Sequence, residues 1–386
     1  MAVSSTRAGR YIRQPEGFSA FVPAPYPPED IQLDYRMLEL LTRADRELGR
    51  LVGAAQILPN PDLFVLMYVR REAVLSSQIE GTQASLMDVL EYEAARRAGE
   101  RRVDVHEVSN YVAALRQGLR RVKELPLSLR LIREIHERLM RGVRGGEPAK
   151  TPGEFRRSQN WVGGASPATA RYVPPPVHEM GQALDALEKA LHEEGGYPLL
   201  IRVGLAHAQF ETIHPFQDGN GRVGRLLVTF LLCQYGVLNE PLLYLSIYFK
   251  EHRQEYYDRL QGVRDNGDWE AWLAFFLEGV ATIAAEATDT ARRIVTLREE
   301  LRERITTTLT RRSGTALRLL DGLFKEPVVS VKSVEKLVGY SQPAAGALIQ
   351  AMERAGILLE FTGRQRGRLW EFRPYLRLFR ERGLRE

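Results

Sequence analysis

Apolar residues recur at spacings of three and four positions along most of the first 310 residues, which predicts a mainly helical chain. The first run begins at about Asp34, with Leu38, Leu41 and Leu48 on one face, and Pro59 and Pro61 interrupt it. Further helices are predicted at 62–80 and in a segment that contains Val108, Val112 and Leu115 and ends at about 119. Later helices are predicted at 129–140, 178–192, 197–213, 222–235, 253–264 and 269–304.

Two stretches do not have this helical pattern. Residues 1–35 are rich in proline and aromatic residues, which excludes helix and predicts an ordered arm lying over a domain. Residues 141–176 are rich in glycine and proline and predict an irregular segment. Within it, Trp161–Val162 and Arg171–Val173 are expected to form the arms of a short hairpin.

The last part of the chain has a different pattern, beginning near Gly314. Helices are predicted at 316–324, 333–338 and 342–355, followed by strands at 357–361 and 369–372 that residues 363–367 join. Three helices followed by a basic hairpin resemble a winged helix-turn-helix.

Composition and charge narrow the function classes. The single cysteine, Cys233, excludes an intramolecular disulfide framework and a multi-cysteine metal site. No apolar run approaches the ~20 residues that span a bilayer, and residues 1–10 lack an apolar signal region, so we expect a cytoplasmic protein without a membrane partner. Residues 311–386 hold 15 Lys or Arg against 8 Asp or Glu, which suggests an acidic partner such as nucleic acid for this part.

The most informative segment for chemistry is 214–225, with the sequence HPFQDGNGRVGR. A glycine-rich turn before a helix start is typical of an anion site, because backbone N–H groups and the helix dipole both favour phosphate. Arg222 and Arg225 share one helix face and can hold further phosphates. Asp218 is suited to bridge Mg²⁺ to those phosphates, and His214 to accept a proton from a hydroxyl group.

Other interpretations of this segment were weighed. Gly219, Gly221 and Gly224 match the dinucleotide-binding fingerprint, but a helical rather than a strand pattern precedes them. A Walker A loop requires Lys-Ser/Thr where Arg225-Leu226 stands. A zinc site at His207 and His214 lacks the HExxH context, and His207 is better explained as a core or supporting histidine. The segment could also be an ordinary capped helix start.

Residues 214–225 match HPFx(D/E)GNGRxxR, the signature of the Fic (filamentation induced by cAMP) family, without a departure. Residues 134–136, 152–156 and 172–175 resemble upstream landmarks of that family, and 244–272 its downstream helices. The resemblance covers about residues 10–285. It implies a mainly α fold: a Fic-type helical core with a short β-hairpin flap, followed here by the α+β winged helix. The expected units are an arm (1–35), an N-terminal helical region (36–125), the Fic core (126–285), a connecting helix (286–312) and the winged helix (313–386).

The resemblance also implies an activity, the transfer of AMP from ATP to a hydroxyl side chain of a target protein or of the enzyme itself (AMPylation), with Mg²⁺. His214 would deprotonate the target hydroxyl, Asp218 would hold the metal, and Arg225 would contact the γ-phosphate. The implied ATP-binding residues are Asp218, Gly219, Asn220, Gly221, Arg222, Val223, Gly224, Arg225 and Tyr257. Tyr256 is as readily explained by helix core.

Two further features follow from the same resemblance. The hairpin would be a flap that docks the target as an added strand, through Val162, Gly163, Tyr172 and Val173; a plain surface loop is the alternative. Residues 76–81 match the inhibitory motif (S/T)xxxE(G/N), carried by Ser76, Glu80 and Gly81. The implied inhibition is an ion pair between Glu80 and Arg225 that removes the partner of the γ-phosphate.

The role of the C-terminal part is open between DNA binding and protein docking. Arg364, Arg366 and Arg368 are suited to phosphate contacts, but the expected recognition helix carries Arg354 as its one basic residue. The alternative to an AMP-transferring enzyme is therefore a DNA-binding transcriptional regulator whose Fic core senses nucleotide or removes AMP. A homodimer, the target protein and the preferred nucleotide also stay open.

Overall fold

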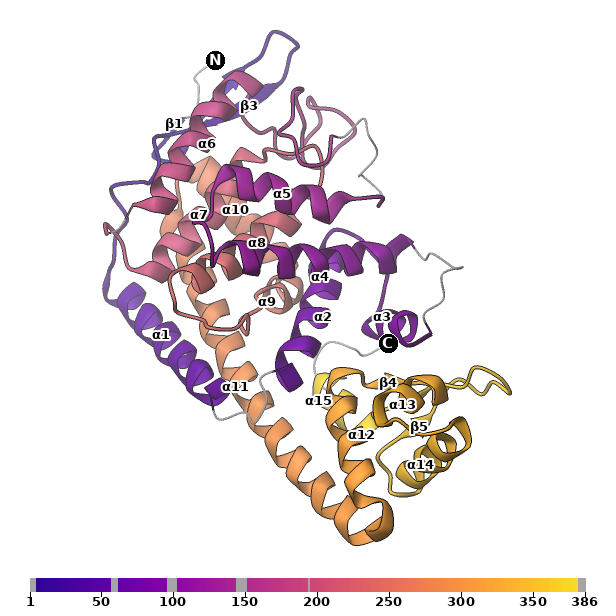
Figure 1. The fold of residues 1–386 in the computed structure, drawn as a ribbon. Helices are drawn as coiled ribbons and strands as arrows, with labels where there is room; N and C mark the ends of the chain where they lie inside the picture. The colour runs from indigo at the N-terminus through magenta and orange to yellow at the C-terminus, as the bar shows by residue number, and fades with distance from the viewer. Residues whose placement is uncertain (1–4, 57–61, 96–102, 144–150, 194, 381–386) are drawn as a thin grey trace.

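The computed structural model describes residues 5–56, 62–95, 103–143, 151–193 and 195–380, and these are mainly helical with two small sheets (Figure 1). The interruption expected at Pro59 and Pro61 lies outside the described residues, as does the end of the unit expected at 313–386. Helices form where apolar residues recur every three or four positions, because this spacing places those residues on one face that the helix can bury.

The helices of the larger part are α1 (Tyr35–Gln56), α2 (Asp62–Ile79), α3 (Leu86–Ala95), α4 (Val103–Arg121), α5 (Leu129–Met140), α6 (Val177–His192), α7 (Leu199–Ile213), α8 (Asn220–Gln234), α9 (Ser246–Glu251), α10 (Arg253–Asn266) and α11 (Trp269–Thr308). Helix α9 lies within 244–272, where the resemblance implied helices, but the apolar spacing alone did not predict it. Helices α7 and α8 are buried almost throughout, because both are apolar on all sides. The start of α8 is therefore held among other helices rather than at the surface.

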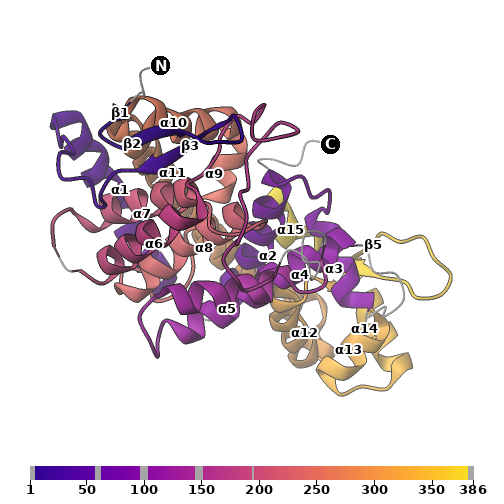
Figure 2. The ribbon, with the colours of Figure 1, turned by 90° about the horizontal axis from the view of Figure 1, so that it is seen from above.

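The N-terminal arm contains strands that its proline content hid. Strands β1 (Ser5–Thr6), β2 (Gly9–Arg13) and β3 (Ser19–Pro23) form an antiparallel sheet in that order, with Tyr11 opposite Phe21. Figure 2 shows this sheet lying over the helices near α10. The sequence pattern did not predict this sheet, because the prolines lie at the strand ends and beyond them.

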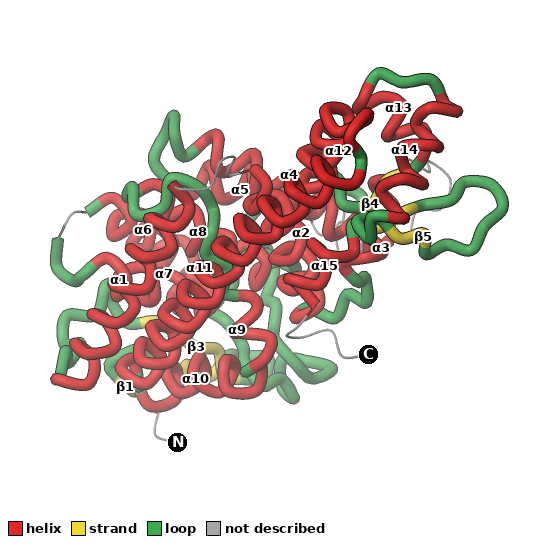
Figure 3. Tube along the Cα trace, turned by 90° about the horizontal axis from the view of Figure 1, so that it is seen from below, coloured by secondary structure: helices red, strands yellow, loops and turns green. Residues whose placement is uncertain are grey.

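Helix α11 is a single 40-residue element that runs from the larger part into the C-terminal part, with α1 packed along it (Figures 1 and 3). The boundary expected at 285/286 falls inside it. In the described part of the chain, α11 alone is long and apolar enough to cross a membrane by length and composition. Most of its apolar window is buried in the structure, as in a core helix of a soluble protein.

The C-terminal part contains α12 (Ser313–Lys325), β4 (Val328–Val329), α13 (Val331–Val338), α14 (Gln342–Arg354), β5 (Leu359–Glu360), β6 (Trp370–Glu371) and α15 (Arg373–Arg380), with a short 3-10 turn at 310–312 before them. The two predicted strands pair antiparallel, and β4 adds a third strand in the order β4-β6-β5. Sequence patterns did not predict β4 or α15.

The C-terminal part packs against α2. Phe379 of α15 meets the ring of Tyr68 edge-on at 5.5 Å between centroids. Arg70 of α2 donates from Nη1 to the carbonyl of Lys325 at 3.2 Å and pairs with Glu93 of α3 at 2.8 Å. Helix α2 therefore joins the two parts of the molecule.

Candidate functional site

The turn between α7 and α8 is held in one conformation by polar side chains. His214 ends α7 in the left-handed conformation with φ of 49°, which is uncommon for a residue other than glycine. Asn220 accepts from the N–H of Phe216 at 2.8 Å and donates to its carbonyl at 2.7 Å. Asn160 and Arg156 donate to the carbonyl of His214 at 3.2 and 3.1 Å. The backbone of His214 is thereby held at the beginning of the turn that leads into α8.

The start of α8 has the form of an anion site. Gly219, with φ of 81°, precedes the first helical residue, Asn220, and no side chain caps the free N–H groups. A Cβ at Gly219 would lie 2.8 Å from Met140 Sδ, and one at Gly221 would lie 2.3 Å from Oε1 of Glu80. Glycine is required at both positions by close neighbours, and the neighbour at Gly221 is a carboxylate.

Glu80 and Arg225 form the ion pair that the inhibitory motif implies. Arg225 donates from Nη2 to Oε1 of Glu80 at 2.7 Å, and its side chain is 2% exposed. It also donates from Nε to Ser76 Oγ at 2.8 Å and from Nη2 to the Ser76 carbonyl at 2.9 Å. Burial alone would raise the pKa of Glu80, but Arg225 holds that pKa below its ordinary value. Glu80 is therefore an anion seated on the first turn of α8.

The end of α2 determines where this carboxylate lies. Helix α2 stops at Ile79, and Gly81 follows Glu80 with φ of 98°, a left-handed conformation suited to glycine. Arg253 of α10 donates to the carbonyl of Ile79 at 3.0 Å, and Lys250 donates to Gln78 Oε1 at 2.5 Å. These contacts hold the end of α2 against α9 and α10.

Arg222 faces the other side of the same helix start and is much less well satisfied. Its Nη1 lies 3.6 Å from Oε2 of Glu107, and its Nη2 lies 3.4 Å from Oδ1 of Asp218. Nε and Nη1 are buried without a hydrogen-bond partner among the described residues. Asp218 Oδ1 also accepts from the N–H of Gly219 at 2.6 Å. Glu107, from α4, was missed because nothing near it in the sequence resembles a site.

Two histidines support the turn and the helix. Gly153 donates its N–H to Nδ1 of His136 at 2.9 Å, so Nε2 carries the proton that reaches the Asp218 carbonyl at 3.0 Å. His207 contacts the Gly224 carbonyl through Nδ1 and the Tyr256 hydroxyl through Nε2, each at 2.9 Å. Burial lowers the pKa of both to about 4, which keeps both rings neutral. His207 is a supporting histidine, as one of the sequence interpretations held, and the described residues contain no cluster of three potential metal ligands of the His, Cys, Asp and Glu types.

The surroundings of His214 include an acidic residue that sequence reasoning missed. Oε2 of Glu211 lies 4.0 Å from Nδ1 of His214, one turn earlier in α7. Burial lowers the pKa of His214 to about 4, and Arg264 and Arg156 act in the same direction. The imidazole is therefore neutral at pH 7 and able to accept a proton. Glu211 is the one acidic residue of α7 and lies three positions before His214, and this was the available signal.

The expected hairpin is reduced to one bridge. Val162 donates its N–H to the Tyr172 carbonyl at 2.8 Å, and Tyr172 donates to the Val162 carbonyl at 3.2 Å. Gly163, with φ of 70°, begins the turn. Tyr172 and Val173 are buried, and the Val173 carbonyl accepts from Phe21 of β3 at 2.9 Å. The 172–173 arm is thus part of the core, and the 162–163 arm forms the outer edge.

The two tyrosines expected near the nucleotide have different surroundings. Tyr256 is buried and donates to His207, as in an ordinary helix core. Tyr257 is half-buried beside Arg253, whose guanidinium lies 5.7 Å from the centre of its ring. Burial raises the pKa of Tyr257, and Glu80 raises it further, so the phenol is within electrostatic reach of the Glu80 carboxylate.

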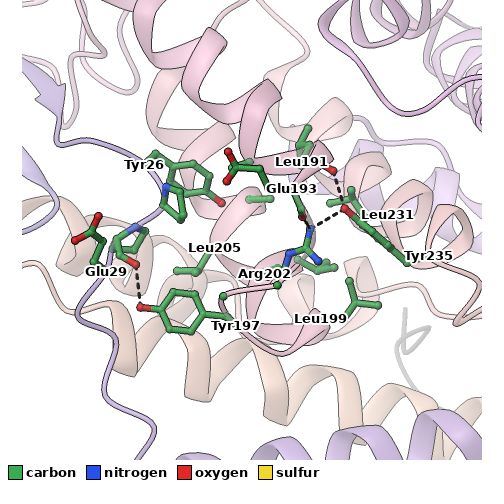
Figure 4. A pocket seen from close by; sticks show the side chains of 17 residues that line it. Tyr26, Glu29, Leu191, Glu193, Tyr197, Leu199, Arg202, Leu205, Leu231 and Tyr235 are labelled. Atoms are coloured by element: carbon green, nitrogen blue, oxygen red, sulfur yellow. Dashed lines mark hydrogen bonds between the residues drawn. The ribbon is translucent and has the colours of Figure 1, made fainter.

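A separate cavity of about 400 Å³ lies at the other end of α8 (Figure 4). Residues 26–29 of the arm, the end of α6, the start of α7, and Leu231 and Tyr235 line it. Tyr197 donates to the Pro28 carbonyl at 2.9 Å, and Arg202 donates to the Tyr235 hydroxyl at 2.7 Å, so these polar groups hold the arm and the helices together. The cavity shares no residue with the anion site.

Comparisons with known proteins agree with this geometry. Residues 38–120 match the Fic/DOC family N-terminal model, and residues 126–232 match the Fic/DOC family model. The protein adenylyltransferase Fic of Aedes aegypti is 34% identical over 154 residues, which cover 39% of this chain and 27% of that protein. A probable protein adenylyltransferase of Aquifex aeolicus is 29% identical over 176 residues, which cover 46% of this chain and 51% of that protein.

Solved structures show the same fold. A Fic family protein from Desulfovibrio desulfuricans G20 superposes with a TM-score of 0.56 at 19% identity, covering 90% of this chain and 98% of that one. A Fic domain-containing signalling protein from Bacteroides thetaiotaomicron VPI-5482 gives 0.51 at 19% identity, with 66% and 97% covered. With both family regions, the curated relatives and the fold in agreement, residues 38–120 and 126–232 of this chain belong to the Fic/DOC family.

Proposed function

We propose that this protein is a protein adenylyltransferase, transferring AMP from ATP to a hydroxyl side chain, and that Glu80 holds it in an inhibited state. The observation that carries the proposal is the carboxylate of Glu80 on the first turn of α8, 2.7 Å from Arg225. A helix start that binds one anion so closely is suited to a phosphate group. The names of the curated relatives support the choice of AMP transfer.

In this mechanism the phosphates of ATP lie on the N–H groups at Gly219 to Gly221. Arg222 and, once Glu80 has left, Arg225 balance their charge. The target hydroxyl oxygen attacks the α-phosphorus, the bond between that phosphorus and the α–β bridging oxygen breaks, and diphosphate leaves. His214 accepts the hydroxyl proton, which its neutral imidazole is able to do. Positioning and charge neutralisation provide most of the rate acceleration.

Asp218 fits the role of a magnesium ligand. It supplies one carboxylate beside the anion site, and its side chain is 38% exposed. Mg²⁺ prefers one or two carboxylates together with phosphate oxygens and water. When bound, the ion neutralises phosphate charge, while Arg222 keeps the Asp218 carboxylate in place.

Inhibition follows from charge. While Glu80 occupies Arg225, a γ-phosphate meets a carboxylate instead of a guanidinium, and the triphosphate cannot lie in line with the attacking hydroxyl. A target segment would add as a strand along the outer edge formed by Val162 and Gly163, near His214. The Tyr257 ring would lie on the nucleoside side of the site.

The activity is tested by mass spectrometry of the protein after incubation with ATP and Mg²⁺. We expect the Glu80→Gly variant to gain one or more AMP groups. Replacing His214 with Ala in that variant should lower the rate by about 10³-fold or more, because general base catalysis is lost. If neither the wild type nor the Glu80→Gly variant forms an AMP adduct on itself or on proteins of a cell extract, the proposal is wrong.

For the C-terminal part we propose a winged-helix unit, comprising residues 313–386, that contacts nucleic acid through its hairpin. Arg364, Arg366 and Arg368 are exposed, whereas α14 presents little positive charge. Contacts would therefore be with phosphates rather than with bases. Binding of the full chain to duplex DNA should weaken steeply with salt, and the triple Arg→Gln variant should lose this binding. Binding unaffected by that variant would exclude the hairpin as the contact surface.

A further inference from the structure

Glu211 is a buried carboxyl group without a structural explanation. It lies in the last turn of α7 and is 7% exposed, and its Oε1 has no hydrogen-bond partner among the described residues. An unpartnered buried carboxyl destabilises a fold, so its presence needs a reason. Glu72, a buried glutamate of α2, is better satisfied: its Oε1 accepts hydrogen bonds from Tyr111 and Ser246, although its Oε2 also lacks a partner among the described residues.

The fold makes room for this carboxyl at a further cost. Gly224 lies inside α8, where glycine destabilises a helix relative to alanine. A Cβ at that position would lie 2.3 Å from Oε1 of Glu211. Any other residue at 224 would therefore push the carboxyl away from its place.

Nδ1 of His214 lies beside Glu211, whose backbone carbonyl also acts on the same imidazole. Nδ1 too is buried without a hydrogen-bond partner, and the two groups are 4.0 Å apart. A closure of about 1 Å would form a hydrogen bond, and such bonds are often long in the absence of substrate. The contact would leave Nε2 of His214 as the nitrogen that accepts the proton from the target hydroxyl.

We propose that Glu211 is a positioning residue for His214: it fixes the tautomer with the proton on Nδ1 and stabilises the imidazolium that forms during transfer. The proposal rests on the proposed function, because it assigns His214 the role of base. Glu211 touches neither the target hydroxyl nor ATP and acts through His214.

The charges around Glu211 set the pH range in which it acts. Charged and titratable groups from several elements interact electrostatically with Glu211. They are His214 at the end of α7, Arg225 on α8, Tyr256, Tyr257 and Arg264 on α10, Tyr172 in the hairpin, and Glu80 after α2. Burial raises the pKa of Glu211 to about 7, Arg225 and Arg264 lower it, and Glu80 raises it. In a Glu80→Gly variant that pKa should be lower, since one negative charge is removed. The carboxylate form, which acts on His214, is present above that pKa.

The test compares Glu211→Gln with its parent in the Glu80→Gly background. Glutamine keeps the volume beside Gly224 but loses the negative charge. We expect kcat at pH 8 to fall about tenfold with little change in KM for ATP, and the rise of kcat with pH between about 5 and 7 to disappear. The control is Glu47→Gln, an equally buried glutamate of α1 that pairs with Arg50, and it should keep both kcat and the pH profile. An unchanged pH profile in Glu211→Gln, or a change in KM alone, would overturn the proposal.

A second readout does not depend on turnover. Nitrogen-15 NMR of histidine-labelled protein at pH 8 reports which nitrogen of His214 carries the proton. We expect the Nδ1–H tautomer in the parent and a mixture of tautomers in Glu211→Gln. An identical His214 spectrum in both proteins overturns the positioning role. Absence of AMP transfer in the Glu80→Gly parent would instead contradict the proposed function. In that case the spectrum would still show whether Glu211 contacts His214.

Discussion

The two arginines at the start of α8, Arg225 and Arg222, differ greatly in how many of their N–H groups form hydrogen bonds. On the side of α2, Arg225 makes three hydrogen bonds, to Ser76 and Glu80, and is almost fully buried. On the side of α4 and α5, Arg222 is equally buried, yet two of its donor nitrogens have no hydrogen-bond partner among the described residues.

This difference separates the α2 side, which Glu80 closes, from the α4 side, where donor groups lack hydrogen bonds among the described residues. Unpartnered buried donors destabilise a fold, and a bound anion would remove that cost. The α2 side already holds an anion, in the form of Glu80, so a ligand must displace it. On the α4 side, two donor nitrogens of Arg222 lack hydrogen bonds within the part of the chain that the structure describes, although both are buried.

The largest expected effect comes from removing the carboxylate that closes the α2 side. Glu80→Gly should raise the rate of AMP incorporation about 100-fold, because Arg225 becomes available to the γ-phosphate. Incorporation of label from ATP measures it. Glu80→Gln separates charge from contact: it should give an intermediate rate, since the amide still reaches Arg225 but no longer repels phosphate. An unchanged rate in Glu80→Gly would mean that the ion pair does not control the enzyme.

The next effect concerns stability and should differ between the two arginines. Arg225→Met should lower the free energy of unfolding by about 2 kcal/mol, since it leaves Ser76 Oγ buried without its donor and Glu80 without its partner. Arg222→Met should change it by less than about 1 kcal/mol, because few good contacts are lost. Urea unfolding followed by circular dichroism measures both. Equal losses would show that Arg222 is as well satisfied as Arg225.

A smaller effect is expected from diphosphate as a probe of the open side. At ten times its Kd, diphosphate should stabilise the wild type by about 1.4 kcal/mol, which raises Tm by about 2 °C. Arg225→Gln should retain this shift and Arg222→Gln should lose it, because only Arg222 has free donors in the inhibited state. Thermal unfolding monitored by fluorescence gives the result. A shift lost equally in both variants would contradict the difference between the two sides.

The smallest effect is the pH dependence of the ion pair. Because Arg225 holds the pKa of Glu80 below its ordinary 4.5, the pair stabilises the protein above that pH and loses its contribution as pH falls through the lowered pKa. The stability difference between wild type and Glu80→Gln should be below about 1 kcal/mol, constant from about pH 7 to 5, and smaller under pH 4.5. Urea unfolding at several pH values tests this, with Glu124→Gln, at an exposed site, as the control.

The sequence was most informative where the structure is local. The apolar spacing located most helices, and residues 214–225 lie together because one turn and one helix contain them. It was least informative where partners are distant. Strands β1 to β3 depend on pairing with one another rather than on an alternating pattern, and β4 is two residues long, so neither had a local signature.

The same distinction applies to the site. The motif around Glu80 indicated its contact with Arg225, although 145 positions separate the two. Glu107 and Asn160 could not be found this way, because they reach the site from α4 and from an irregular segment through packing alone. Glu211 could have been found, since it lies on the same face of α7 as His214, three positions earlier.

The unbroken length of α11 has a consequence for selectivity. Forty residues of helix extend about 60 Å, and α1 packs along part of that length. Under the proposed function, a partner bound by the C-terminal part would be presented to His214 at a distance and orientation that this helix sets. Partners whose dimensions match that distance would then be the ones that are modified.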